Sequence, residues 1–418
     1  MAEARFLAAA DLHLGRPIAS LPAALRERSA ELGPFGALER LVELARRERV
    51  DALLLAGDVV DDDGAYFEVF SALQNAVEKL DGLPVLAIAG NHDAHVLPKL
   101  AASIDGLTLL GDAGTWESKA VPTAVGDIEI LGWGFPDSHH TASPFDTPPP
   151  RSTRRRIGLL HGDADTPRSV YAPFTAAHLR EHAADAWLLG HVHTPSHARL
   201  AGDHPSGYLG SLCGLDPSET GPRGAWLVRC DGRGVSLEHR PLAPIGWAGV
   251  SIECDGLDTG SIDTTARERA EMAAAQFESA RAVGVRIVLA GEHDAWQDIN
   301  ARAAAIEPGH PWQHRGRAVF IEKIEGQVTP PLHLERLAGE RSAAGRIASL
   351  ILELRAGDAG ELVERAETEF SSISGRHNFR PPEMGEVALP PPEARPTLER
   401  EARAMLGALL AQRAEGSA

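Results

Sequence analysis

The sequence predicts an α/β protein whose first part is built in layers around parallel strands. Apolar runs of strand length alternate with helical stretches in this part of the chain. Several runs stop at a glycine, aspartate or histidine, and ligands bind outside the carboxyl ends of the strands in open α/β sheets. Near residues 241–247 the pattern changes, and a small α+β unit followed by a helical tail is expected.

The early elements alternate as strand, helix, strand, helix and strand. Residues 51–56 form a continuous apolar run stopped by Gly57, as expected of a strand buried on both faces. Helices are expected over residues 34–49 and 65–80. The other runs predicted to be strands lie at residues 4–11, 84–89, 128–131, 157–160, 186–189 and 225–228.

The second half of the sequence divides into shorter units. The expected elements of the α+β unit are strands at residues 250–254, 285–289 and 318–324 and helices at residues 263–282 and 295–306. Proline-rich sequence then indicates an extended linker, and a final apolar stripe indicates an amphipathic helix. The predicted divisions are a first domain at 1–245, the α+β domain at 246–332, a helical segment at 333–375, the linker at 376–396 and the last helix at 397–418.

The composition favours an acidic protein of the cytoplasm. The 418 residues carry a formal net charge of −18, so the surface as a whole does not suit nucleic-acid phosphates. If DNA is the substrate, a local basic patch or a partner must supply much of the attraction. The three cysteines show no disulfide or metal spacing, which favours reduced thiols. No apolar run approaches the roughly 18 residues that span a membrane, so no membrane contact is expected.

Metal-ligand residue types recur at the ends of the apolar runs. Carboxylate and amide oxygens bind hard divalent cations, and imidazole suits manganese, iron and zinc. A lone Asp-x-His or His-x-His is most often a surface or capping feature, but five stations in strand-end positions indicate a dinuclear site. One ion is assigned to Asp11, His13, Asp58 and His193, and the other to Asp58, Asn91, His161 and His191. Manganese is the expected metal, with Mg²⁺, Fe²⁺ and Zn²⁺ as alternatives.

Such a site would serve the hydrolysis of a phosphoester. Two ions about 3.5–4 Å apart lower the pKa of a shared water and hold the phosphate for in-line displacement. Asp58 is expected to bridge the ions with its two oxygens. His92 is the candidate acid for the leaving oxygen, and Asp93 is the candidate to orient His92 by accepting an imidazole N–H. The acidic run at residues 61–63 is interpreted as a solvated loop rather than a third metal site.

The order of these stations resembles that of a known family. Asp-x-His, Gly-Asp, Gly-Asn-His-Asp, a single His and Gly-His-x-His are similar to the signature of the calcineurin-like metallophosphoesterases. Residues 208–211 and 218–224 further resemble the SbcD-type DNA repair exonucleases, especially their YhaO-like bacterial branch. The resemblance implies a metallophosphoesterase sheet sandwich flanked by helices, with residues 246–332 as a DNA-facing capping domain.

The resemblance also implies an activity and partners. It indicates an Mn-dependent DNA exonuclease, and a homodimer, working in DNA repair with an SbcC-like coiled-coil ATPase. The ATPase would dock on residues 334–372 or on the stripe at 398–410, although that stripe could equally pack on its own chain. Candidate contacts to the DNA backbone are Arg16, Arg154, Arg155 and Arg156. A solvated loop is the simpler interpretation of the last three.

Two alternatives stay open. The acidic charge and the low aromatic content favour a phosphodiesterase acting on small nucleotides or cyclic nucleotides, and the C-terminal region would also suit a scaffold. One departure from the family bears on the activity. Related double-strand-break nucleases carry a histidine shortly after the Gly-Asp station, whereas Asp58 is followed by Val-Val-Asp-Asp-Asp. The balance between endonuclease and exonuclease activity is therefore open.

Overall fold

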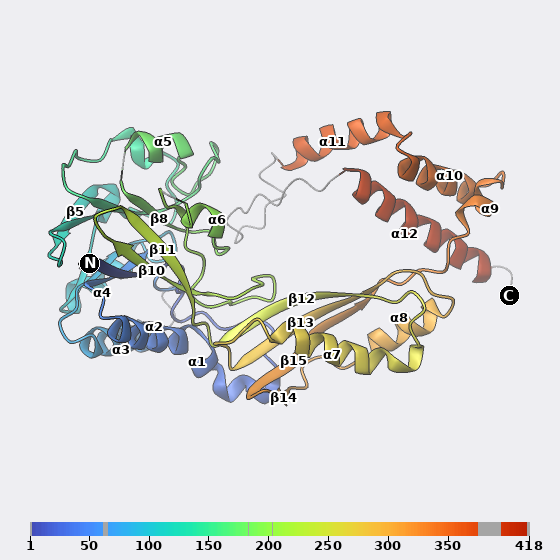
Figure 1. Cartoon of the computed structure of the whole chain (residues 1–418), viewed down its shortest axis with the longest axis horizontal. Coiled ribbons are helices and arrows are strands. Elements are labelled where there is room, and N and C mark those ends of the chain that lie inside the picture. Colours follow the sequence, from blue (N-terminus) through green and yellow to red (C-terminus); the bar gives the residue numbers. More distant parts are fainter. Residues whose placement is uncertain (1, 62–65, 183, 203, 375–393, 416–418) are drawn as a thin grey trace. The chain divides into compact units, whose positions relative to one another are not determined.

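The computed structural model describes residues 2–61, 66–182, 184–202, 204–374 and 394–415. The chain divides into two compact units. The first comprises Met1–Ala248, Glu271–Val285 and Gly309–Glu322. The second comprises Gly249–Ala270, Arg286–Pro308 and Lys323–Ala418. Their elements are labelled in Figure 1.

The first unit contains a six-stranded sheet in the order β11-β10-β1-β2-β3-β4. Its parallel strands are β1 (Ala4–Ala9), β2 (Ala52–Ala56), β3 (Val85–Ile88) and β4 (Leu107–Leu109). At one edge, β10 (Gly224–Cys230) pairs antiparallel with β1, and β11 (Val235–Pro241) pairs antiparallel with β10. The long helices of this part are α2 (Pro34–Glu48) and α3 (Tyr66–Lys79). Shorter helices are α1 (Ser29–Leu32) and α4 (Leu97–Ser103).

A five-stranded sheet in the order β5-β6-β7-β8-β9 forms the second layer of this unit. Its parallel strands are β6 (Ile128–Trp133), β7 (Arg156–His161), β8 (Ala186–Gly190) and β9 (Ser206–Tyr208). The edge strand β5 (Trp116–Val121) runs antiparallel to β6. Two short helices, α5 (Ala176–Glu181) and α6 (His197–Leu200), belong to the loops of this sheet.

Alternate side chains of each central strand fill two different cores. In β2, Leu54 packs between the two sheets, in the same cluster as Ile130 of β6. Its neighbours Leu53 and Leu55 lie on the other face, in a cluster with Leu41 of α2. Successive side chains of a strand point to opposite faces, so a strand covered on both sides must be apolar throughout. The predicted sandwich of sheets flanked by helices is confirmed.

A four-stranded sheet in the order β12-β13-β15-β14 follows. Its strands are β12 (Ile245–Glu253), β13 (Ala282–Ala290), β14 (Trp312–His314) and β15 (Arg317–Gly326), and its helices are α7 (Ile262–Ala274) and α8 (Trp296–Ala305). The helix predicted to reach residue 282 ends at Ala274. Arg317 Nη1 donates to the carbonyl oxygens of Ala274 and Phe277, both at 2.6 Å, and Phe277 is buried. These contacts hold the chain in a turn where the sequence pattern would allow a longer helix.

The C-terminal helices pack on one another within the second unit. They are α9 (Leu334–Ala338), α10 (Ala343–Ala356), α11 (Gly360–Ser374) and α12 (Ala394–Glu415). Ala402 and Leu406 of α12 are buried in one cluster with Ala348 and Ile351 of α10, so part of the predicted apolar stripe packs on its own chain, while Met405 of the stripe is exposed. Most of the predicted linker at 376–396 lies outside the described residues, and its last three positions begin α12. No helix in the described ranges is long and apolar enough to cross a membrane.

Candidate metal centre

The candidate ligands follow five strands at one edge of the sandwich. Asp11 and His13 come just after β1, Asp58 after β2 and Asn91 after β3. In the second sheet, His161 ends β7, and His191 and His193 follow β8. Because β1, β2 and β3 are mutually parallel, and β7 and β8 are too, the carboxyl ends within each sheet lie together. The structure brings all seven predicted ligands together in two adjoining clusters.

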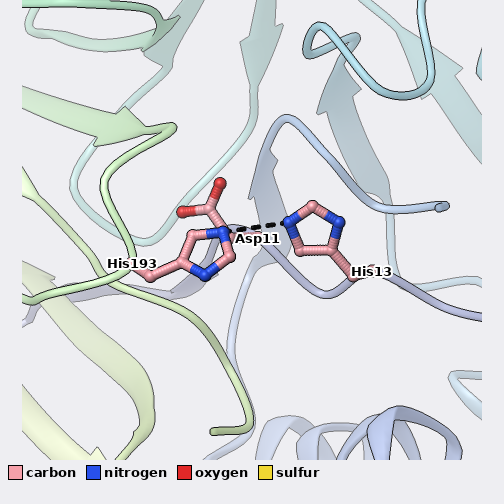
Figure 2. Close-up of side chains that lie close together, drawn as sticks. All are labelled: Asp11, His13 and His193. Atoms are coloured by element: carbon pink, nitrogen blue, oxygen red, sulfur yellow. Dashed lines mark hydrogen bonds between the residues drawn. The ribbon is translucent and has the colours of Figure 1, made fainter. Parts of the chain in front are cut away.

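The first cluster consists of Asp11, His13 and His193, whose candidate ligand atoms all lie within 4.8 Å of one another. Figure 2 shows the two imidazoles facing each other beside the Asp11 carboxylate. His13 Nε2 lies 3.0 Å from His193 Nε2. Asp11 Oδ1 accepts the backbone N–H of His191 at 2.9 Å, whereas the buried Oδ2 has no hydrogen-bond partner.

Outer carboxylates set the protons on these two imidazoles. His13 Nδ1 lies 3.0 Å from Asp61 Oδ1, and His193 Nδ1 lies 2.9 Å from Glu219 Oε1. An ionised carboxylate only accepts, so each Nδ1 carries the hydrogen and donates it. With neutral rings, both Nε2 atoms then present lone pairs to each other across 3.0 Å. That arrangement, beside an unpartnered Asp11 oxygen, fits a cation, because neighbouring ligands about 2.1 Å from one ion lie roughly 3 Å apart.

The second cluster repeats this arrangement with Asp58, Asn91, His161 and His191. His161 Nδ1 donates to the Ala56 carbonyl at 3.1 Å, which leaves Nε2 facing Asn91 Oδ1 at 3.2 Å and Asp58 Oδ2 at 3.3 Å. His191 Nε2 lies 3.3 Å from Asp163 Oδ1, and its Nδ1 faces the same Asn91 oxygen at 3.0 Å. Four acceptors thus converge, and this cluster also fits a divalent ion.

Asp58 joins the two clusters through one oxygen. Its Oδ2 lies 3.3 Å from His161 Nε2 and 3.8 Å from His13 Nε2. Its Oδ1 accepts the backbone N–H of His92 at 2.9 Å. The short contacts of Asp58 with both clusters are made by Oδ2, and the expectation that Asp58 bridges two ions with both oxygens stays a prediction.

The buried charges create a negative potential at this edge. Burial disfavours the charged form of His161, but the carboxylates of Asp58 and Asp11 outweigh this and raise its pKa to about 9. Burial also opposes ionisation of Asp58, yet His161 and His13 hold the pKa of its carboxyl well below the usual value. A field that favours a proton on His161 also favours a metal cation at the same place.

Four of the ligands have a positive φ. The φ angles are +49° at Asp11, +47° at His13, +47° at Asp58 and +98° at His191. This region is uncommon for residues other than glycine and costs on the order of 1 kcal/mol or more at each position. The turns allow the chain to leave β1, β2 and β8 and still present these side chains at the edge of the sandwich.

Glycine at position 90 lets Asp58 lie against the loop after β3. A Cβ built on Gly90 would overlap Asp58 Oδ1 and its backbone nitrogen. Gly57, at a φ of +90°, lies in the same way against the His161 imidazole. The glycines of the Gly-Asp and Gly-Asn-His-Asp stations therefore keep space for two ligands.

Replacing Gly90 with alanine is expected to displace Asp58 and weaken divalent-metal binding about tenfold or more. Overpacking at this buried position should also lower stability by about 1–3 kcal/mol. Calorimetric titration with Mn²⁺ and thermal unfolding in chelator would measure both effects. Gly232→Ala is the matched control, because a Cβ there meets nothing within 4 Å. Wild-type Mn²⁺ affinity in Gly90→Ala would contradict this account of the glycine.

The structure corrects the role expected of Asp93. Its Oδ2 accepts the backbone N–H groups of Val59 at 2.7 Å and Val60 at 3.2 Å, and its Oδ1 accepts that of Gly90 at 2.7 Å. Asp93 therefore joins the loops that carry Asp58 and Asn91, and its carboxylate is directed at the backbone. Burial, together with the charge of Asp58, raises the pKa of Asp93 to about 7.

Asp61 occupies the place expected for Asp93. Its Oδ1 lies 3.3 Å from His92 Nδ1 and 3.0 Å from His13 Nδ1. The interpretation of residues 61–63 as a solvated loop is thus wrong for Asp61, while Asp62 and Asp63 lie outside the described residues. Asp61 lies three positions after Asp58, in the stretch where the resemblance to the double-strand-break nucleases implies a histidine. A carboxylate there can orient His92 but cannot replace an imidazole as a second acid.

The arginine cluster lies away from the metal centre. Arg156 begins β7 and His161 ends it, which separates them by roughly 16 Å at the usual rise per strand residue. Arg156 is buried against Glu129, with Nη2 3.1 Å from Oε2, and Arg155 donates to the Asp231 carbonyl. Arg154 is more exposed, 3.8 Å from Asp127. The structure therefore does not bring these residues to the ligands.

Arg16, by contrast, lies beside the site. It is half-buried in the loop after β1, where its backbone N–H donates to the His13 carbonyl at 3.0 Å. Burial opposes the ionisation of Asp61, but His13 and His92, with a smaller contribution from Arg16, lower the pKa of its carboxyl.

Three carboxylates near the ligands were not predicted. Asp61 contacts His13, Asp163 contacts His191, and Glu219 contacts His193. Such partners commonly fix the tautomer and orientation of ligand histidines. Glu219 belongs to residues 218–224, which stood out in the sequence only because they resemble the SbcD-type exonucleases. Asp163 follows His161 by two positions, but nothing in that spacing indicates a contact with His191.

The fold and the two ligand clusters define a metal-dependent phosphoesterase. Residues 4–195 match the model of the calcineurin-like phosphoesterases, so this part of the chain is similar to that family. It is a family of metal-dependent hydrolases with a dinuclear site, and the two clusters provide the ligands for one.

Several proteins are similar to this chain. The uncharacterized metallophosphoesterase YhaO of Bacillus subtilis is 28% identical over 313 residues, which are 70% of this chain and 72% of YhaO. The DNA double-strand break repair protein Mre11 of Methanosarcina mazei is 26% identical over 266 residues, 61% of this chain and 40% of that protein. The solved structure of TT1561 of Thermus thermophilus is 16% identical, with a TM-score of 0.34 over 56% of this chain and 98% of that one.

Proposed function

We propose that this protein is a dinuclear, manganese-type phosphodiesterase that acts on DNA, as an exonuclease in DNA repair. The observation that carries the chemistry is the convergence of seven acceptor side chains in two clusters that share Asp58 Oδ2. The choice of DNA draws on the similarity to Mre11, a DNA double-strand break repair protein in Methanosarcina mazei. Because the net charge is acidic, the electrostatic attraction to DNA would come from local groups such as Arg16 or from a partner.

The residues around the clusters have distinct roles in this proposal. Bound divalent ions would polarise the phosphate and supply a nucleophilic water at neutral pH. His92 is 38% exposed at its side chain and can reach a substrate, and Asp61 Oδ1 lies 3.3 Å from its Nδ1. Burial lowers the pKa of His92 and outweighs the nearby carboxylates of Asp58 and Asp61, so the ring would donate to the phosphate or to the leaving oxygen once the charge of a bound substrate adds to theirs. Asp93 keeps the loops of Asp58 and Asn91 in register through the backbone.

An SbcC-like coiled-coil ATPase and a second copy of this chain are the proposed partners, and the cytoplasm is the proposed location. The buried, unpaired state of Cys213, Cys230 and Cys254 accords with a reducing compartment. Docking of the ATPase through the apolar stripe of α12 would require this helix to leave α10, because Ala402 and Leu406 are buried there. We therefore favour another surface of the helices over residues 334–372 for that contact.

Hydrolysis of end-labelled linear DNA with Mn²⁺ tests the proposal. Linear DNA should be degraded from its ends, closed circular DNA should resist, and chelator should stop the reaction. Asp58→Asn purified in parallel controls for contaminating nucleases. Turnover of cyclic nucleotides or small diesters with no cleavage of either DNA would instead establish the small-molecule alternative. Binding of the ATPase without any hydrolysis would establish a scaffold.

A further inference from the structure

The loop between β9 and β10 carries a buried acidic side chain that the proposed chemistry does not use. In the sequence, residues 208–224 were distinguished only by their resemblance to DNA repair exonucleases. In the structure, Glu219 of this stretch lies beneath the first cluster, with its side chain 11% exposed. Burying a carboxylate costs free energy unless the charge is paired, so the contacts of Glu219 indicate its role.

Each oxygen of Glu219 has defined partners. Oε1 accepts from His193 Nδ1 at 2.9 Å. Oε2 accepts from the Ser211 hydroxyl at 2.7 Å and, at 3.4 Å, from the backbone N–H of Leu215. The contacts at Oε2 therefore fix the carboxylate, and with it the position of Oε1 opposite His193.

The backbone of His193 is fixed separately. Arg223, which is buried, donates from Nη1 to the His193 carbonyl and from Nη2 to the Thr220 carbonyl at 3.2 Å. The backbone N–H of Ser211 donates to the same His193 carbonyl at 2.9 Å. With the main chain held this way, the contact with Glu219 decides the rotation and the tautomer of the ring.

The hydrogen between Glu219 and His193 belongs to the imidazole ring. Glu219 Oε1 lies 2.9 Å from His193 Nδ1, and an ionised carboxylate only accepts, so His193 Nδ1 supplies the hydrogen.

We infer that Glu219 is a positioning residue for the first metal cluster, acting through His193 to present the Nε2 lone pair opposite that of His13. This inference rests on the proposed function in taking the clusters to be metal sites. Asp61 does the same for His13, so the two imidazoles are held from opposite sides with their Nε2 atoms 3.0 Å apart. The 218–224 stretch therefore serves the metal centre.

The second cluster supplies a matched comparison. Asp163 Oδ1 lies 3.3 Å from His191 Nε2, so Asp163 is placed to orient a ligand of the other cluster. Glu219→Gln and Asp163→Asn remove one charge each at similar positions relative to their histidines. Glu219→Gln should weaken the binding of one ion of the pair, and Asp163→Asn should weaken the binding of the other.

Calorimetric titration of the full chain with Mn²⁺ tests the inference. The wild type should bind two ions per chain. In Glu219→Gln, one ion should bind about 10–100-fold more weakly while the other keeps its affinity. Glu219→Asp, which keeps the charge but withdraws it from Nδ1, should give the same one-site loss, and serves if the glutamine variant does not fold. A two-site wild-type isotherm in a folded Glu219 variant would overturn the inference.

A double-mutant cycle separates positioning from general support of the loop. In a His193→Ala background, Glu219→Gln should cause no further loss of Mn²⁺ affinity, whereas Asp163→Asn should still weaken the remaining ion. Equal losses from Glu219→Gln with and without His193 would show that Glu219 acts otherwise, and would refute this role. If the wild type binds no pair of ions, the proposed function itself fails, which is distinct from either result.

Discussion

Replacing Asp58 with asparagine is expected to remove Mn²⁺-dependent hydrolysis, with a fall in rate on the order of 10³-fold or more. Asp58 Oδ2 faces both clusters, at 3.3 Å from His161 Nε2 and 3.8 Å from His13 Nε2. An amide there would present a neutral oxygen or an N–H group among acceptors. Metal content and turnover of a small phosphodiester would be measured together, and both should fall.

Asp51→Asn is the matched control for that variant. Asp51 lies just before β2, at the opposite end of the strand from Asp58, and its Oδ2 accepts the Arg5 backbone N–H at 2.8 Å. Its replacement should leave metal content and turnover close to those of the wild type. If Asp58→Asn keeps two ions and more than a tenth of the activity, Asp58 is not the shared ligand.

Replacing His92 with glutamine should lower kcat by roughly 10²–10⁴-fold while both ions stay bound. The reason is that the ring lies beside the clusters, partly exposed, with Asp61 at Nδ1. Asp61→Asn should lower both kcat and the affinity for Mn²⁺, because the same carboxylate also orients His13. The fall in kcat should be smaller than in His92→Gln. Steady-state kinetics with metal analysis would separate these effects.

His95→Gln serves as the control for His92, because His95 is exposed and contacts Asp137 instead of a ligand. Its kinetics should match the wild type. Loss of an ion from His92→Gln would show that His92 binds metal directly, which would replace its assignment as the acid.

The ligands could be predicted because their positions follow from local rules. Asp11, Asp58 and His161 each stand at the end of an apolar run, and the carboxyl ends of parallel strands meet at one edge. The same rule, applied to Arg156, would have placed it at the beginning of a strand and far from the site. A contact of this arginine cluster with the DNA backbone would therefore lie away from the metal centre, and it stays a prediction.

Other features depend on contacts between distant parts of the chain. Asp61, Asp163 and Glu219 lie on loops, where no period in the sequence tells which histidine a carboxylate will meet. The end of α7 at Ala274 depends on Arg317, more than forty residues further along the chain. Only the folded structure brings such pairs together, so spacing alone could not reveal them.

The two sheets contribute ligands to the same clusters, with Asp11 and His13 from one sheet and His193 from the other. An ion held by all three would therefore act as a cross-link between the layers, and separating the layers would require its release. At a free concentration 100 times its Kd, one such ion adds about 2.7 kcal/mol to the free energy of unfolding. Metal supply would then govern how long this protein survives heat and proteolysis, apart from any effect on catalysis.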